Sequence, residues 1–180
     1  TGRLYAFDVS GHRLDALKPR LARSGLSNVH PAALAHERDD RVKRLAGKID
    51  RVLVDAPCSG LGTLRRNPDL KWRQSPQALE ELVAKQTAIL ESAARLPKSG
   101  GRLVYATCSM LPQENEAIAE AFTQAHRDFE PLDAGELLAQ LKVPEAASLC
   151  SGGESGSRFV RLWPHRHQTD GFFAAVWQRK

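Results

Sequence analysis

The sequence predicts an α/β fold built on a doubly wound sheet. Short apolar runs of strand length alternate with longer helical patterns along the chain, the order typical of such sheets. Three of these runs end in polar or reactive residues, as strands do where ligands bind at the carboxyl edge of a sheet. The length of 180 residues suits one domain, so we expect a single domain over residues 1–180.

The first part of the chain is expected to form a strand, a helix and a second strand. Residues 4–8 are an apolar run that ends in an acid, which predicts a buried strand. Leucines recur at helical spacing over residues 14–21, between a candidate N-cap at Ser10 and a stop signal at Gly25. The run over residues 29–34 is a weaker strand candidate because a proline interrupts it.

The rest of the chain repeats the alternation and closes with a hairpin. β-Branched residues over 49–54 predict a central strand, and a long loop follows them. Ser75 and Pro76 then supply the N-cap and first position of a long helix. Another strand is expected over residues 102–106. Two apolar segments predict an antiparallel pair at the edge of the sheet: residues 158–163 and 171–177.

Composition excludes several classes of protein. No uncharged apolar stretch has the length of a membrane helix, and the first residues do not resemble a secretory signal. The three cysteines form no CxxC pair, so neither a structural zinc site nor a disulfide framework is expected, and no metal is predicted. These features predict a protein of the reducing cytoplasm with free thiols, and the formal net charge of +5 permits an acidic partner.

Two of the cysteines follow predicted strands. Cys58 comes three residues after Asp55, at the end of the strand over 49–54, and Cys108 follows the strand over 102–106. A lone cytoplasmic cysteine is most often a small buried apolar residue. Since the carboxyl ends of neighbouring parallel strands share one edge of a sheet, these two thiols can meet there, and we interpret them as candidates for chemistry.

Three long segments resemble signature segments of the Sun family of bacterial ribosomal RNA (cytosine-5) methyltransferases. They are DAPCSGLGTLRRNPDLKW at residues 55–72, YATCSMLPQENE at 105–116 and HQTDGFFAAVW at 167–177. The resemblance implies a Rossmann-like methyltransferase sheet, mostly parallel, with an antiparallel C-terminal hairpin. It also implies an enzyme that uses S-adenosyl-L-methionine to methylate C5 of a cytosine in small-subunit ribosomal RNA.

The resemblance assigns roles to three residues. Cys108 is expected to add to C6 of the base as the nucleophile, and Cys58 to assist removal of the C5 proton and release of the product. Asp55 is expected to hydrogen-bond the base or the cofactor. The pair Pro57 and Cys58 also resembles DNA cytosine-5 methyltransferases, in which the cysteine after the proline is the nucleophile. The longer segments favour Cys108.

Cofactor binding is expected to involve Asp8, because an acid at the end of the second strand binds ribose hydroxyls in dinucleotide-type folds. The glycine-rich turn of such folds lies about 20 residues before that acid, so it would fall before Thr1 together with the first strand of the family. That strand normally lies between the strands ending at Asp8 and Asp55. We therefore expect an N-terminally truncated catalytic domain with a gap in its sheet, inactive by itself.

A second departure from the family concerns the adenine side of the cofactor. Ala33 stands where an acid is usual. Either this contact is lost or a nearby residue replaces it, the candidates being His36, Glu37 and Asp39.

The segment 65–73 combines four basic residues and one acid with a tryptophan, which suits phosphate binding beside base stacking. The RNA contacts that we predict are Arg65, Arg66, Asn67, Lys71 and Trp72, with His167 as a weaker candidate. The alternative is a simple turn over residues 67–69 with Trp72 packed beneath it. For the whole chain, the alternative function is a non-catalytic RNA-binding or scaffold domain that retains the methyltransferase fold.

Overall fold

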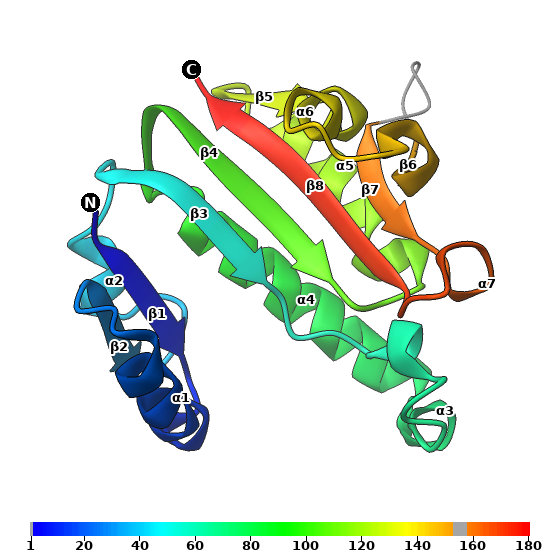
Figure 1. Ribbon diagram of the computed structural model, residues 1–180, viewed down its shortest axis with the longest axis horizontal. Coiled ribbons are helices and arrows are strands. Elements are labelled where there is room, and N and C mark those ends of the chain that lie inside the picture. The colour runs from blue at the N-terminus through cyan, green and yellow to red at the C-terminus, as the bar shows by residue number, and fades with distance from the viewer. Residues whose placement is uncertain (1, 153–157) are drawn as a thin grey trace. The chain divides into compact units, whose positions relative to one another are not determined.

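The computed structural model describes residues 2–152 and 158–180 and divides the chain into two compact units, Thr1–Arg44 and Leu45–Lys180 (Figure 1). Each unit has a sheet of its own. No helix in the described part of the chain has both the length and the apolar character needed to cross a membrane.

The first unit contains a parallel pair of strands. Its elements are β1 (Leu4–Asp8), α1 (Gly11–Ser24), β2 (Val29–Ala33) and α2 (Asp40–Lys43). The Ser10 side chain accepts a hydrogen bond from the amide of Arg13 at 3.3 Å and caps α1, and Gly25 ends the helix at a φ of 67°. The predicted strands, helix and helix ends in this part of the chain are confirmed, but the expected burial of residues 4–8 is wrong: Leu4 is 54% exposed and the other residues of β1 are half-buried.

The second unit contains a six-stranded sheet in the order β3-β4-β8-β7-β6, with β5 also paired to β8. Its elements are β3 (Ile49–Asp55), η1 (Leu61–Thr63), α3 (Leu70–Arg73), α4 (Pro76–Ala93), β4 (Pro97–Thr107), η2 (Pro112–Glu114), α5 (Glu116–Ala125), β5 (Phe129–Leu132), α6 (Ala134–Gln140), η3 (Ala146–Leu149), β6 (Cys150–Ser151), β7 (Phe159–Leu162), α7 (Pro164–His167) and β8 (Phe172–Arg179). β3 and β4 run parallel, and the remaining ladders are antiparallel.

The α/β fold and the antiparallel pairing of β7 with β8 are confirmed, but two strands occupy other places than predicted. β8 lies inside the sheet, between β4 and β7, and not at its edge (Figure 1). Its apolar residues Phe173 and Trp177 are buried, as expected for an interior strand covered on its faces. β3, which we predicted to be central, pairs only with β4 among the described strands, and its Leu53 is 68% exposed.

β1 and β3 belong to separate sheets, and no ladder joins them within residues 2–152 and 158–180. In each sheet, one parallel strand ends at an acid that the sequence analysis selected as a candidate site residue. Asp8 is the last residue of β1 and Asp55 the last residue of β3.

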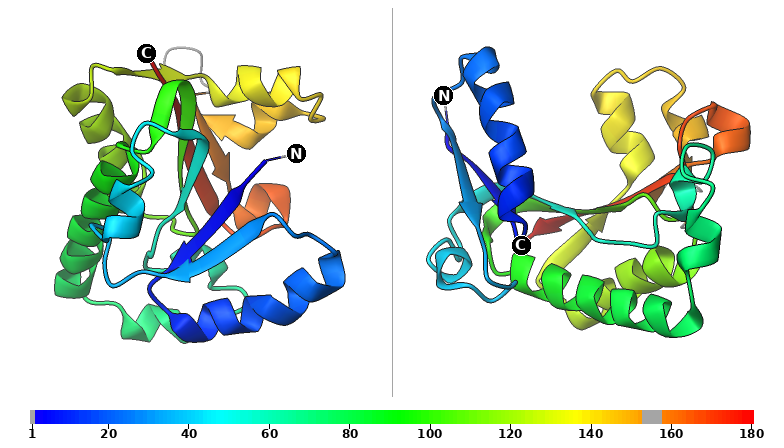
Figure 2. Two further views of the ribbon diagram at one scale, coloured as in Figure 1. Left: turned by 90° about the vertical axis from the view of Figure 1, so that its left-hand side faces the viewer. Right: turned by 90° about the horizontal axis from the view of Figure 1, so that it is seen from below.

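Helices cover both faces of the larger sheet. Figure 2 shows α4 and α5 on one face and α6 on the other. Leu90 of α4 and Phe122 of α5 join Leu103, Tyr105 and Trp177 of the sheet in one buried cluster. The predicted start of α4 is confirmed, since the side chain of its N-cap serine accepts a hydrogen bond from the helix. This packed frame supports the loops that leave the carboxyl ends of β3 and β4.

Candidate active site

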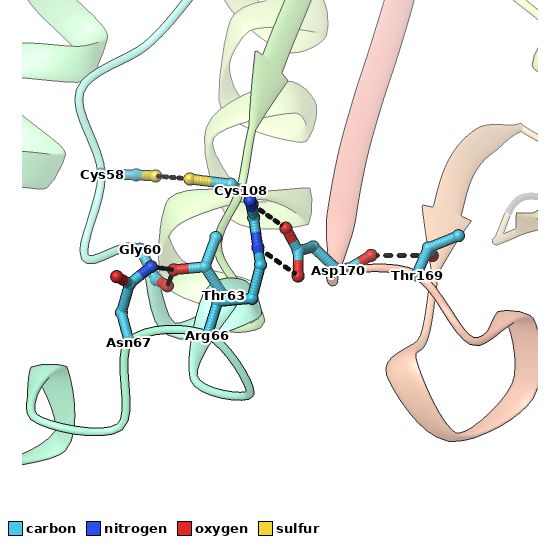
Figure 3. Close-up of polar contacts among 8 residues, drawn as sticks. All are labelled: Cys58, Gly60, Thr63, Arg66, Asn67, Cys108, Thr169 and Asp170. Atoms are coloured by element: carbon cyan, nitrogen blue, oxygen red, sulfur yellow. Dashed lines mark hydrogen bonds and ion pairs between the residues drawn. The ribbon is translucent and has the colours of Figure 1, made fainter.

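The two cysteine loops leave the sheet side by side. Asp55 at the end of β3 pairs with Ala106 near the end of β4, and the amide of Ala56 donates to the carbonyl of Ala106 at 2.9 Å. Because these strands are parallel neighbours, the chain turns out of the sheet at the same edge in both cases. The Sγ atoms of Cys58 and Cys108 consequently lie 3.4 Å apart, although 50 residues separate them (Figure 3).

The contact between the thiols makes them chemically unequal. Either sulfur can be the donor in this contact. When Cys58 carries the proton, the hydrogen bond lowers the pKa of Cys108 from the ordinary value of 9.0 to about 7, against the opposing effects of burial, Asp55 and Glu114. The same hydrogen bond, followed by burial, raises the pKa of Cys58 far above its ordinary range. At neutral pH the Cys108 thiolate is therefore the available nucleophile of the pair.

This inequality predicts a pH dependence. A thiol deprotonates as pH rises, so alkylation of Cys108 by iodoacetamide is expected to increase about tenfold per pH unit below 7 and to level off above about 7. In Cys58→Ala the S–H donor is gone, and the midpoint is expected to move up toward 9. Mass spectrometry of the labelled peptides over pH 5–10 measures both, with Cys150, whose pKa is raised by burial, as the internal comparison. A wild-type midpoint near 9 would contradict the assignment.

A fully buried carboxylate joins the two cysteine loops. Glu114 is 0% exposed, and its Oε1 accepts from the amide of Ser59 at 2.8 Å and from Nε2 of Gln86 at 2.9 Å. Its Oε2 accepts from the hydroxyl of Ser59 at 2.6 Å and from the hydroxyl of Ser109. Ser59 follows Cys58 and Ser109 follows Cys108, so one side chain fixes the neighbours of both thiols.

Sequence reasoning did not identify Glu114. It lies in the segment 105–116 that carries the family resemblance, but a glutamate near the start of a helix is ordinarily solvent-exposed. The only signal was its place between two polar residues inside that segment.

Contacts from three other parts of the chain hold the residues after β4. The carbonyl of Cys108 accepts from the amide of Gly62 at 2.8 Å, and the Ser109 hydroxyl donates to the buried carboxylate. The carbonyl of Met110 accepts from Nη2 of Arg161 at 2.9 Å. Arg161 is itself 2% exposed, which is unusual for an arginine and is consistent with a role in holding this loop. Cys108 thus lies on a loop with little freedom to move.

In the first unit, the carboxylate of Asp8 can accept further hydrogen bonds. Oδ1 of Asp8 accepts from the amide of Ser10 at 2.8 Å, and Oδ2 accepts from Nη1 of Arg13 at 3.3 Å. Each carboxylate oxygen has two acceptor sites, so both retain capacity for a hydroxyl group. With its side chain 25% exposed, Asp8 fits the predicted contact with the ribose of S-adenosylmethionine.

The register of the small sheet places Ala33 opposite Asp8. Of the candidate replacements for the missing acid, Asp39 already accepts from the amides of Ala35 at 3.1 Å and Arg41 at 2.9 Å. His36 and Glu37 also make contacts within the same loop: Nδ1 of His36 accepts from the amide of Arg38 at 3.1 Å, and Glu37 forms an ion pair with Arg38 at 3.7 Å.

Five of the six predicted RNA contacts are exposed, among them Arg65, Lys71 and Trp72. Trp72 is 80% exposed, so the alternative in which it packs beneath a turn is wrong. Nζ of Lys71 lies 4.8 Å from the centre of the Trp72 ring, and Arg65 is also exposed. The turn at residues 67–69 leads into the four-residue helix α3, which carries Lys71 and Trp72 and has no buried residue.

The other three candidates are engaged within the protein. Arg66 donates to both carboxylate oxygens of Asp170, at 3.2 Å from Nε to Oδ1. The Asn67 amide donates to Oγ1 of Thr63 at 3.1 Å. His167 accepts from the amide of Trp163 at 2.8 Å through Nδ1, and its Nε2 donates to the carbonyl of Ser148 at 3.0 Å.

A cavity of about 250 Å³ opens beside the cysteine loops. Its lining is largely apolar and consists of Ser59, Gln74, Ser75, Pro76, Leu79 and Leu111. Ser59 and Leu111 connect it to the segments that carry the two thiols.

Comparisons with known proteins all find similarity to methyltransferases of small-subunit ribosomal RNA. A family model described as 16S rRNA methyltransferase RsmB/F matches residues 1–178. The "Probable ribosomal RNA small subunit methyltransferase B" of Synechocystis sp. is 42% identical over 179 residues, which are 97% of this chain and 37% of that protein. The ribosomal RNA small subunit methyltransferase F of Aeromonas salmonicida is 35% identical over 176 residues, covering 97% of this chain and 34% of that protein. The chain thus spans little more than a third of these relatives.

Solved structures show the same likeness. The crystal structure of PH0851 has a TM-score of 0.85 and 37% sequence identity, covering 99% of this chain and 37% of that one. NSun6 from Pyrococcus horikoshii, determined with SFG, has a TM-score of 0.77 and 26% identity, covering 99% of this chain and 42% of that one.

Proposed function

Because the chain belongs to the family of 16S rRNA methyltransferases RsmB/F, the Sun family that its three segments resemble, we propose that it transfers a methyl group from S-adenosylmethionine to C5 of a cytosine in small-subunit ribosomal RNA. One observation carries the cytosine-5 chemistry. Two thiols lie 3.4 Å apart at the ends of parallel strands, and one of them is about half thiolate at neutral pH. A methyltransferase acting on a more nucleophilic atom would have no use for such a pair.

The first step belongs to Cys108. C5 of cytosine is a poor nucleophile, and addition of the Cys108 thiolate to C6 places the displaced electron pair where C5 can use it. S-adenosylmethionine, when bound, supplies the methyl group that C5 attacks. Asp55 would hydrogen-bond the base near the ring nitrogen that gains electron density, and Asp8 would bind the ribose of the cofactor.

The second step belongs to Cys58. While Cys108 is a thiolate, its hydrogen bond keeps Cys58 protonated. Once the sulfur of Cys108 is bonded to carbon, that cause ends and only burial still raises the pKa of Cys58, so Cys58 can lose its proton to solvent more readily and accept the proton from C5. Removal of this proton restores the aromatic ring and expels Cys108 as a thiolate. The hydrogen bond between the thiols therefore sets the order in which they act.

The RNA must present an unstacked base to these groups. The exposed Trp72 and the neighbouring basic residues form a surface for single-stranded RNA. A base can stack on the Trp72 ring while the basic side chains bind the phosphates. The apolar cavity next to Ser59 provides concave space on the same side of the cysteine loops. We assign RNA contacts to Arg65, Lys71 and Trp72, because Arg66, Asn67 and His167 are used within the protein.

This assignment predicts different effects for charge and for stacking. Arg65→Ala combined with Lys71→Ala is expected to weaken RNA binding and to reduce the slope of log affinity against log salt by about 1.4. Trp72→Ala is expected to cost about 1–3 kcal/mol of binding with the slope unchanged. Fluorescence anisotropy over a salt series measures both. The matched control is Arg95→Ala, which lies just before the amino end of β4, away from the carboxyl ends of the strands. An unchanged slope in the double variant would remove these residues from the interface.

The proposed activity is tested by identifying the product. Full-length protein is incubated with unmodified small-subunit ribosomal RNA and methyl-labelled S-adenosylmethionine, and the RNA is digested to nucleosides. Label in 5-methylcytidine is expected. Label in another nucleoside would overturn the cytosine-5 assignment, and RNA binding without any transfer of label would support the non-catalytic alternative.

A further inference from the structure

Three loops of the second unit meet at Gly62. Its amide donates to the carbonyl of Cys108 at 2.8 Å, and its carbonyl accepts from the amide of Gly171 at 2.8 Å. A Cβ atom at Gly62 would lie 2.6 Å from the Cys108 carbonyl oxygen and would also overlap the carbonyl of Gly171. The backbone at this point can approach both loops only because residue 62 has no side chain. The place of the nucleophile is thus linked to the loop before β8.

A side-chain contact closes the same junction. Arg66, four residues after Gly62, donates to both carboxylate oxygens of Asp170, the residue before Gly171 (Figure 3). The Asp170 side chain is 24% exposed and the Arg66 side chain 65%, so the carboxylate lies partly inside the junction while the guanidinium reaches it from the surface. The turn between Gly62 and Arg66 is stiffened by Thr63, whose hydroxyl donates to the carbonyl of Gly60 at 2.8 Å.

The arrangement leaves Arg66 poorly suited to hold a phosphate. Two of its nitrogen atoms already bind a carboxylate, which neutralises its charge and fixes its fork geometry. Arg65, its neighbour in the sequence, is exposed and makes no such pair in the described part of the chain. The two arginines of the motif therefore have different environments.

We infer that the ion pair of Arg66 with Asp170 is a clamp that positions Cys108, acting through the backbone junction of Gly62 with Gly171. Arg66 is in this view a positioning residue. The inference rests on the proposed role of Cys108 as the nucleophile. The clamp fixes the Cys108 carbonyl from one side while the buried carboxylate of Glu114 fixes Ser109 from the other, and together they keep the thiols at their short separation.

The test reads the thiol directly and uses neither RNA nor cofactor. The groups that face Cys108 are Cys58, Asp55 and Glu114, and a displaced Cys108 loses the S–H donor while it keeps the two negative neighbours. Arg66→Ala and Asp170→Ala are each expected to slow alkylation of Cys108 at pH 7 about fivefold and to move its pH midpoint upward. Peptide mass spectrometry after a timed pulse of iodoacetamide measures the rate.

A charge reversal separates a clamp from a loss of stability. The double variant Arg66→Asp with Asp170→Arg restores the pairing in reverse and is expected to recover at least half of the lost alkylation rate. The matched control is Asp69→Ala, which removes an ion pair of 2.6 Å with Arg73 on the nearby helix α3 and is expected to leave the rate unchanged. Unchanged alkylation in both single variants, or a loss in both without recovery in the double variant, overturns the clamp.

RNA binding provides the second readout. Arg66→Ala is expected to leave the salt slope of RNA affinity unchanged, whereas a reduced slope with normal alkylation would make Arg66 an RNA contact and overturn the inference. Failure of the proposed function is recognised separately, because it leaves wild-type protein without label transfer whatever the alkylation rates are.

Discussion

Replacing Cys108 by alanine is expected to abolish methyl transfer, with a loss of roughly 10⁴-fold or more. Without the thiolate no electron pair reaches C5, and Cys58 is not expected to replace it, since burial still raises the pKa of Cys58 in the variant. The same variant is expected to form no covalent complex with RNA. Label transfer and a denaturing gel with labelled RNA measure the two effects.

Cys58→Ala is the matched counterpart. It keeps the nucleophile but lacks the group that assists removal of the C5 proton, so a covalent complex with RNA is expected to accumulate in the presence of S-adenosylmethionine. Since the variant also lacks the S–H donor to Cys108, its complex is expected to form faster at pH 9 than at pH 7. A complex formed by Cys108→Ala and not by Cys58→Ala would make Cys58 the nucleophile.

Replacing Glu114 by alanine is expected to lower the free energy of unfolding by about 3 kcal/mol or more. The carboxylate is 0% exposed, and its loss removes a buried acceptor from the amide of Ser59 and from Nε2 of Gln86, which keeps only its hydrogen bond to the carbonyl of Pro57 at 2.8 Å. Urea unfolding followed by circular dichroism measures the change, and an unchanged m-value would locate the effect in the folded state.

Glu114→Gln is the control of the same shape. Its carbonyl oxygen can still accept from Ser59 and Gln86, and the hydroxyls of Ser59 and Ser109 can rotate to accept from the new amide group. A loss of about 1 kcal/mol is expected. Because the negative charge of Glu114 raises the pKa of Cys108, this variant is also expected to shift the alkylation midpoint downward. Equal losses of stability in the two variants would contradict the assigned hydrogen bonds.

Local patterns predicted much of this structure. The caps of α1 and α4 were predicted because a capping side chain acts on amides only a few residues away. The meeting of Cys58 with Cys108 followed from a general property of parallel strands, whose carboxyl ends share one edge. The internal order of the sheet did not follow, because the place of β8 between β4 and β7 depends on pairing over long separations.

The supporting contacts of the site were beyond local reasoning for the same reason. Arg66 and Asp170 are 104 residues apart, and neither carries a pattern that names the other. The sequence also could not predict which side chains of the segment 65–73 are free to contact RNA. An arginine, an asparagine and a tryptophan in one basic segment suggested a common role, yet Trp72 is exposed while Arg66 and Asn67 bind partners within the protein.

The unequal burial of the tryptophans makes the protein its own optical reporter. Trp177 is 1% exposed in the core, and Trp72 is 80% exposed on the proposed RNA surface. Emission from the exposed indole lies at longer wavelength and is open to quenching by a stacked base, whereas the buried indole responds to unfolding. With Trp163, the third tryptophan, replaced by phenylalanine, the long- and short-wavelength parts of the tryptophan emission therefore report occupancy of the surface and integrity of the fold in one sample, without an added dye.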